Sequence, residues 1–315
     1  MSEPVSDTIL GDDLKKKRGP GPLFFQIIPF FMSSFFFLSA LFSLFAPLPL
    51  LLFYLRTSLT WLSLAVVSNT VLVGVLGGIW SAILFFALVG APSLLIAFGF
   101  IRKRMSIEKT IGLNLLLIAL VGGGLVYYGI THPAQPWVIA TQHTFAQITE
   151  QVHTLAQKNG GEWLDVTLKE FQEQVVSELP SSIAIVVLIM SWVNISLLLS
   201  LNPRNVRKML GIDARYFKRW RAPFALVWPT MAFGALAIWG QGWVGDSAMG
   251  ALKFFLTIYA LQGLAIMAFF MDRFKILGIF RSLFYLLALM LMLPLVLGIG
   301  FFDLWFDFRS KFRQT

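Results

Sequence analysis

The polar side chains with the most chemical potential interrupt long apolar runs. Asn69, Asn114, Asn194 and Gln262 each lie within such a run, and Trp192 stands two residues before Asn194. An amide placed in lipid must find a hydrogen-bonding partner, usually on a neighbouring helix. These five residues therefore allow two interpretations. They either join helices to one another, or they line a neutral, hydrogen-bonding pocket for a small molecule.

A second cluster of polar residues follows the last apolar run, in the sequence DLWFDFR. In a continuous helix Asp303, Asp307 and Lys311 would share one face, and Trp305 and Arg309 another. A bond between Asp303 and Arg309 would then require the helix to unwind. The cluster is either a membrane-edge stop with compensated charges, or a place where Asp303 binds a cation elsewhere, such as a loop arginine, and fixes the last helix.

No catalytic residue, cofactor or metal site is predicted. The motifs of nucleotide-binding loops, serine hydrolases and zinc proteases are absent, and there are no cysteines. His132 and His143 are separated by Pro133 and Pro136, and His153 lies further along, so a metal site is not expected. Ionisable groups are nearly absent from the apolar runs, which disfavours a proton-coupled pump. We therefore expect a protein that is not an enzyme.

The elements that carry these residues are membrane helices. Hydrophobic residues make up 57% of the chain and charged residues 13%, compared with about 25% charged residues in soluble domains. The net charge of +9 indicates basic cytoplasmic loops rather than nucleic-acid binding. Such a chain is expected to contact the lipid bilayer along most of its length.

A helix needs about 20 apolar residues to cross the hydrocarbon core. Eight runs meet that requirement, and they are residues 23–44, 58–77, 79–101, 109–131, 181–201, 222–241, 251–271 and 280–302. Pro294 is placed to bend the last of them. A ninth, shorter run at 46–56 begins with prolines. The fold class predicted is all-α, a polytopic integral membrane helical bundle with eight or nine membrane segments.

Basic residues in short loops set the orientation. Residues 15–18 and 102–104 are basic and should share the cytoplasmic side, which requires an even number of crossings between them and favours a crossing by 46–56. The loop 202–221 should also be cytoplasmic. Its basic residues are predicted to face lipid or a partner protein, and they are Arg204, Arg207, Lys208, Arg215, Lys218, Arg219 and Arg221.

The segment 132–180 is predicted to be an extracytoplasmic, amphipathic helical hairpin. Two stripes of apolar residues at helical spacing are separated by Asn159, Gly160 and Gly161, and Pro180 should end the second helix. The remaining parts are a polar, basic cytoplasmic tail (1–22), two membrane bundles (23–131 and 181–302) and a charged aromatic tail (303–315).

Four stretches resemble the YybS-like family of predicted bacterial membrane proteins. They are PLPLLLFYLR (47–56), NPRNVRKMLG (202–211) with WRAP (220–223), YALQGLA (259–265), and the ending with Gly300, Asp303, Trp305, Asp307 and Arg309. The resemblance implies a multi-pass protein of the bacterial inner membrane, and the basic residues 15–18 predict a cytoplasmic N-terminus. The family is more distantly similar to the substrate-binding S components of energy-coupling-factor transporters.

Two functions are expected from these features. The first is a non-enzymatic membrane component that binds a small molecule for uptake, with energy supplied by partner subunits. The second is a structural or assembly protein of the cell envelope that holds membrane-protein partners through its basic loop and its acidic hairpin.

Overall fold

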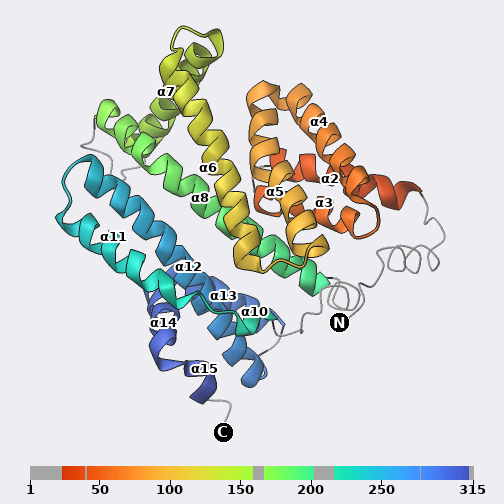
Figure 1. Cartoon of the computed structure of the whole chain (residues 1–315), viewed down its shortest axis with the longest axis vertical. Coiled ribbons are helices and arrows are strands. Elements are labelled where there is room, and N and C mark those ends of the chain that lie inside the picture. Colours follow the sequence, from red (N-terminus) through yellow and green to blue (C-terminus); the bar gives the residue numbers. More distant parts are fainter. Residues whose placement is uncertain (1–22, 40, 159–166, 202–215, 277, 312–315) are drawn as a thin grey trace, which may run out of the picture. The chain divides into compact units, whose positions relative to one another are not determined.

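The computed structural model describes residues 23–39, 41–158, 167–201, 216–276 and 278–311, which form helices and short connections. The protein is an all-helical membrane protein whose helices belong to two compact units (Figure 1). Unit 1 comprises Met1–Asn114 and Met190–Leu210, and unit 2 comprises Leu115–Ile189 and Gly211–Thr315. The basic residues 15–18 and the loop positions 202–215 lie outside the described residues.

Four helical segments in the described part are long and apolar enough to cross a membrane. They are Leu59–Arg102, Ile107–Thr131, Leu168–Leu201 and Trp243–Arg273. A bent pair, Ile279–Leu291 with Leu293–Phe306, would make a fifth. The membrane character predicted from composition is confirmed. The described helices give four or five candidate spans, so the predicted eight or nine segments are not shown.

Unit 1 begins with a helix that breaks and restarts. Helix α2 (Leu23–Leu38) is followed by a single 3-10 turn, η1 (Ser43–Phe45), and by the short helix α3 (Pro47–Tyr54). Pro47 starts α3 because a proline at the first turn loses no helical hydrogen bond. Leu50 and Leu51 of α3 are fully buried, so this short helix lies inside unit 1.

The 44-residue stretch Leu59–Arg102 is a hairpin of two antiparallel segments. Gly78 has φ 82° and ψ 171°, a conformation that L side chains rarely adopt, and it breaks α4 (Leu59–Phe85). A Cβ atom at Gly74 would lie 3.2 Å from Ala82, and one at Gly90 would lie 2.7 Å from Val66. Residues equally distant from Gly78 are therefore neighbours, so the chain reverses there.

The second arm of this hairpin contains two wide, π-helical stretches. They are η2 (Phe86–Gly90) and η3 (Ile96–Arg102), on either side of α5 (Ala91–Leu95). Pro92 lies between them and has no N–H to donate, which favours a shift of the hydrogen-bond register. Helix α6 (Ile107–Thr131) follows, and its first residues up to Asn114 complete this part of unit 1.

Two helices of unit 2 cover the region of the predicted hairpin, but Pro180 does not end the second of them. Helix α7 (Pro136–Lys158) precedes α8 (Leu168–Leu201), which continues through Pro180. Thr167 and Glu170 form reciprocal hydrogen bonds at the start of α8, a capping box. The expectation was wrong because a proline removes one hydrogen bond without necessarily ending a helix. The glycine turn between the helices lies outside the described residues.

Two helices of unit 2 cross with their backbones in close approach. Helix α12 (Trp243–Arg273) and helix α14 (Leu293–Phe306) meet at Gly263 and Gly300. A Cβ atom at Gly263 would overlap the backbone oxygen of Val296, and one at Gly300 would overlap that of Tyr259. Small residues at such crossings allow membrane helices to pack tightly. The crossing places Gln262 beside the C-terminal end of α14.

The last apolar run is not one straight helix. Helix α13 (Ile279–Leu291) and α14 are bent by 96° at Met292, and Pro294 lies in the first turn of α14. A short helix, α15 (Phe308–Lys311), ends the described chain. Before α12, the chain forms α10 (Tyr216–Arg219), the turn η4 (Phe224–Leu226) and α11 (Val227–Trp239). The ends of α10, α12 and α14 carry the charged cluster.

Candidate functional site

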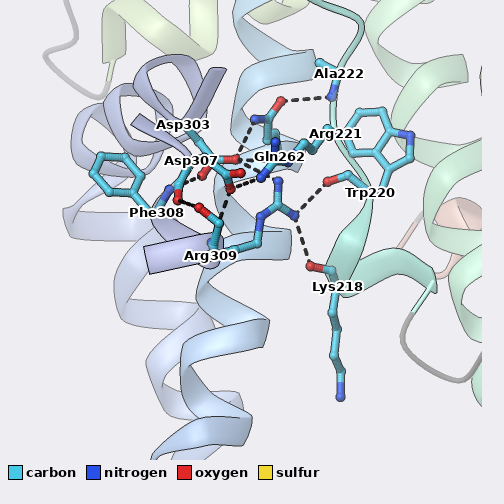
Figure 2. A network of polar contacts seen from close by, with 10 residues as sticks. Lys218, Trp220, Arg221, Ala222, Gln262, Asp303, Asp307, Phe308 and Arg309 are labelled. Atoms are coloured by element: carbon cyan, nitrogen blue, oxygen red, sulfur yellow. Dashed lines mark hydrogen bonds and ion pairs between the residues drawn. The ribbon is translucent and has the colours of Figure 1, made fainter. Parts of the chain in front are cut away.

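The charged cluster of unit 2 is centred on the buried carboxylate of Asp303 (Figure 2). Its Oδ2 accepts hydrogen bonds from Arg309 Nη2 at 2.7 Å and from Gln262 Nε2 at 3.1 Å. Its Oδ1 accepts one from the backbone N–H of Phe308 at 2.9 Å. A buried carboxylate requires this number of donors because its desolvation is costly.

A left-handed residue brings Arg309 to Asp303. Asp307 has φ 42° and ψ 60°, and it ends α14. Asp residues tolerate this conformation better than most non-glycine residues do. The helix does not continue through the tail: the chain unwinds at Asp307, as a bond between Asp303 and Arg309 requires, and Arg309 reaches back to Asp303. Trp305 contacts other aromatic rings, with Phe301 at 4.9 Å and Phe224 at 6.1 Å between ring centroids.

Arg309 also binds the segment that precedes α11. Its Nη1 donates to the backbone oxygens of Lys218 at 3.0 Å and Trp220 at 2.9 Å (Figure 2). The backbone N–H of Ala222 donates to Gln262 Oε1 at 2.9 Å. One buried network thus joins α12, α14, the C-terminal tail and residues 218–222.

A second arginine balances the charges. Arg221 forms an ion pair with Asp307, and its Nε lies 4.0 Å from Asp303 Oδ2. Two arginines therefore face two aspartates. Asp272 at the end of α12 pairs with both Lys218 and Arg281. Two basic residues of the predicted loop, Lys218 and Arg221, thus bind carboxylates of their own chain, in addition to any contact with lipid.

The cluster is suited to hold helices in place. Asp303 is fully buried and Arg309 is 4% exposed, so both charges are withdrawn from water and compensate each other. Such a pair is costly to break, because removal of one partner leaves an uncompensated buried charge. Every oxygen of Asp303 has a donor within the protein, which makes this carboxylate a structural acceptor.

Unit 1 contains a different polar region, made of neutral side chains. Asn69 of α4 is its first member. Asn69 Oδ1 accepts from the Ser34 hydroxyl and from the Ser34 N–H at 3.2 Å, while Nδ2 donates to the backbone oxygens of Phe30 at 2.6 Å and Ala65 at 2.7 Å. Phe30 and Ser34 are one helical turn apart, so this amide binds both the backbone oxygen of Phe30 and the backbone N–H of Ser34 in one turn of α2.

The break between α2 and α3 is held by two further side chains. Ser33 Oγ donates to the backbone oxygen of Ala46 at 2.7 Å. Asn194 Nδ2, on α8, donates to the backbone oxygen of Leu44 at 2.8 Å and to that of Met190 at 2.7 Å. Non-helical backbone inside a membrane protein needs partners of this kind, because lipid supplies none.

Two amide oxygens of this neutral region accept no hydrogen bond from the described residues. Asn114 of α6 donates through Nδ2 to Ser191 Oγ at 3.2 Å, and its Oδ1 is left open. Asn194 uses both hydrogens of Nδ2, and its Oδ1 is also left open. Both residues are fully buried. Unpaired buried acceptors are uncommon and call for an explanation.

The structure gathers only part of the predicted ligand set. Asn114 and Asn194 both belong to the neutral region. Ser191, which accepts a hydrogen bond from Asn114, lies three residues before Asn194 on α8. Trp192 is half-buried and stands two positions from Asn194, which places it on a different face of α8. Asn69 is engaged on α2, and Gln262 belongs to the charged cluster of unit 2.

Several partners were missed from the sequence. Ser33 and Ser34 form an adjacent pair within an apolar run, and that pair was the available signal for a contact with Asn69. Asp272 stands alone at the end of a span and was not singled out, although it pairs with Lys218 and Arg281. No group of three or more histidine, aspartate or glutamate side chains able to hold a metal ion occurs in the described part of the chain.

Comparison with known proteins identifies one family. A family model described as "Predicted membrane protein (DUF2232)" matches residues 24–304. No curated protein and no solved structure matches the chain. The match agrees with the expected family of predicted membrane proteins, whereas nothing in these comparisons supports the expected similarity to the S components of energy-coupling-factor transporters.

Proposed function

The chain belongs to the DUF2232 family of predicted membrane proteins, and from that membership and the chemistry of unit 1 we propose that it is a non-enzymatic component that binds a small molecule. Energy for uptake would come from partner subunits. The observation that supports this proposal is the pair of buried amide oxygens, Asn114 Oδ1 and Asn194 Oδ1, that accept no hydrogen bond from the described residues. An acceptor left open in the interior is stabilised when a bound molecule supplies a donor.

Binding should be visible as thermal stabilisation. A ligand that binds only the folded protein raises Tm in a concentration-dependent manner. We would measure Tm of the purified full-length protein against a panel of water-soluble vitamins, amino acids and metal ions. The proposal expects at least one saturable increase that Asn114→Leu or Asn194→Leu abolishes. Ser93→Ala is the matched control, because Ser93 is a buried polar residue of unit 1 whose hydroxyl donates to the backbone oxygen of Val89 in its own helix turn. A panel without any stabilising compound would contradict the proposal.

A second candidate function is that of an assembly protein of the cell envelope. Helix α7 supports it, because its apolar stripe of Ile148, Val152 and Leu155 is exposed by 54%, 48% and 59%. The amides of Asn69 and Gln262 also serve as bonds between segments of the chain, as a structural protein requires. This function predicts that the tagged protein co-purifies with a defined envelope protein, and that Val152→Glu disrupts the complex without a change in Tm.

The proposed topology has eight or nine membrane segments, with the N-terminus in the cytoplasm of a bacterial cell. The reversal at Gly78 supports it, because the hairpin supplies two segments from one 44-residue stretch. The apolar helix α2 and the shorter apolar helices Ser43–Tyr54 and Phe224–Trp239 supply the additional segments. Lys103 and the α7 helix then lie on opposite sides of the membrane.

The natural absence of cysteine makes this topology easy to test. Lys103→Cys and Gln151→Cys each introduce a single thiol at an exposed position. In intact cells a membrane-impermeant maleimide should label the second variant and not the first. Permeabilised cells should show both labelled. Labelling of both thiols in intact cells would contradict the proposed orientation.

A further inference from the structure

The neutral region of unit 1 also indicates the charge of its ligand. Resting on the proposed function, we infer that Asn114 and Asn194 bind a small monovalent cation next to the break between α2 and α3. The two open atoms are oxygens, and both can only accept hydrogen bonds or coordinate a cation. A molecule that offers only acceptors or a negative charge gains nothing from them.

The identity of the open atom of Asn194 follows from its neighbours. Asn194 Nδ2 donates to two backbone oxygens, those of Leu44 and Met190. A rotated amide would place its oxygen against both of these oxygens and would repel them. The open atom of Asn194 is therefore the oxygen. Asn114 Nδ2 donates to Ser191 Oγ at 3.2 Å, so a hydroxyl oxygen lies beside the amide of Asn114.

The backbone near these side chains has the features of an ion site. Helix α2 ends at Leu38 and α3 begins at Pro47, and the 3-10 turn η1 (Ser43–Phe45) leads into α3. In membrane transporters, unwound backbone and the C-terminal ends of half-helices supply oxygens to coupling cations. The backbone oxygen of Leu44 is held by Asn194, and a carbonyl oxygen has a second lone pair available for a cation.

The charge of the region favours a monovalent ion. Among the described residues of unit 1, every buried polar side chain is neutral, including Ser33, Ser34, Asn69, Asn114, Ser191 and Asn194. Divalent cations such as Ca²⁺ and Mg²⁺ are usually bound by carboxylates. A set of neutral oxygens suits an ion of single charge, whose dehydration costs less.

The experiment compares salts at constant ionic strength. The purified full-length protein is held in choline chloride, which is then replaced stepwise by sodium, potassium or ammonium chloride. We expect one of the three cations to raise Tm saturably, because it binds only the folded state. Asn114→Leu should weaken the apparent affinity by about tenfold or more, as loss of metal-site residues commonly does. Ser93→Ala should leave the response unchanged.

Asn114→Asp gives a second and opposite test. A carboxylate at this position adds a negative charge to the site, so it should tighten cation binding while Asn114→Leu weakens it. Direct binding of radioactive sodium or rubidium to the detergent-solubilised protein provides a measurement that does not depend on Tm. Equal Tm in all four salts together with no radioactive binding would overturn the inference, as would an unchanged response in both Asn114 variants.

These outcomes separate the inference from the function on which it rests. If no cation binds and an uncharged compound of the panel stabilises the protein through Asn194, the cation site is excluded and small-molecule binding stands. If neither cations nor panel compounds bind, both fail, and the open oxygens are sites for water alone.

Discussion

The two units bury polar groups in opposite ways. The charged cluster of unit 2 contains Asp303 and Arg309 with Gln262, and each oxygen of the carboxylate has a donor within the chain. The neutral region of unit 1 contains no buried charge among its described residues, and it leaves two amide oxygens open. A closed network fixes the positions of the segments that it joins. An open network has capacity to bind something else, which is why unit 1 is the place to look for a ligand.

The largest effect should come from breaking the buried ion pair. Asp303→Leu leaves Arg309 without its carboxylate, and Arg309→Met does the reverse. Each single change should lower the free energy of unfolding by about 3–5 kcal/mol, because an uncompensated charge stays buried. Chemical unfolding in mixed detergent would measure it. Lys169→Met, which removes an exposed pair with Glu173, is the control and should have almost no effect.

The double variant tests whether the charges act as a pair. Asp303→Leu combined with Arg309→Met leaves no unpaired charge, so its cost should be well below the sum of the two single costs. Additive costs would show that the two residues act separately, and the description of the cluster as one closed network would then be wrong.

The next effect concerns the close helix crossing beside the cluster. In Gly263→Ala the new Cβ overlaps the backbone oxygen of Val296, so α12 and α14 must separate. We expect a loss of about 1–3 kcal/mol in the free energy of unfolding, the usual cost of overpacking. Gly298→Ala, on α14 with open space around it, is the matched control. Equal stability of the two variants would show that the crossing tolerates separation.

Sequence reasoning was strongest where one residue type has one physical use. Apolar length located the helices, and Gly78 was placed between two predicted spans because glycine interrupts an apolar run there. Reasoning was weakest where a proline or an aspartate has several uses. Pro180 lies within a continuous helix, and Asp307 adopts a left-handed conformation instead of a helical one.

Partners distant in sequence were the other part that could not be predicted. Asn194 bonds the backbone of Leu44, 150 residues away, and any apolar run would supply an equivalent carbonyl. Arg309 likewise bonds backbone oxygens near Trp220, which carry no signature in the sequence. Backbone acceptors are the same at every residue, so only the fold determines which of them a buried side chain meets.

A smaller effect is expected in the neutral region. Asn69→Leu removes the bonds to Phe30, Ser34 and Ala65 and should cost about 1–3 kcal/mol in the free energy of unfolding. The cost is below that of the ion pair because no charge is left behind. Ser68→Ala, at the neighbouring half-buried position, removes only a hydroxyl that bonds its own helix turn and should change stability by less than about 0.5 kcal/mol. If Asn69→Leu cost as much as Asp303→Leu, the distinction between charged and neutral regions would lose its energetic basis.

The smallest effect should come from the outer ion pair of the charged cluster. Arg221 and Asp307 are each about 40% exposed, with 42% and 38% of their side chains accessible. Arg221→Gln should therefore cost less than about 1 kcal/mol, and that cost should shrink further as salt screens the pair. The inner pair of Asp303 and Arg309 is withdrawn from solvent, so the cost of Arg309→Met should hardly change with salt. Unfolding measured at low and high sodium chloride compares the two variants directly. A cost for Arg221→Gln that is large and independent of salt would mean that Arg221, rather than Arg309, supplies the main compensation of the buried carboxylate.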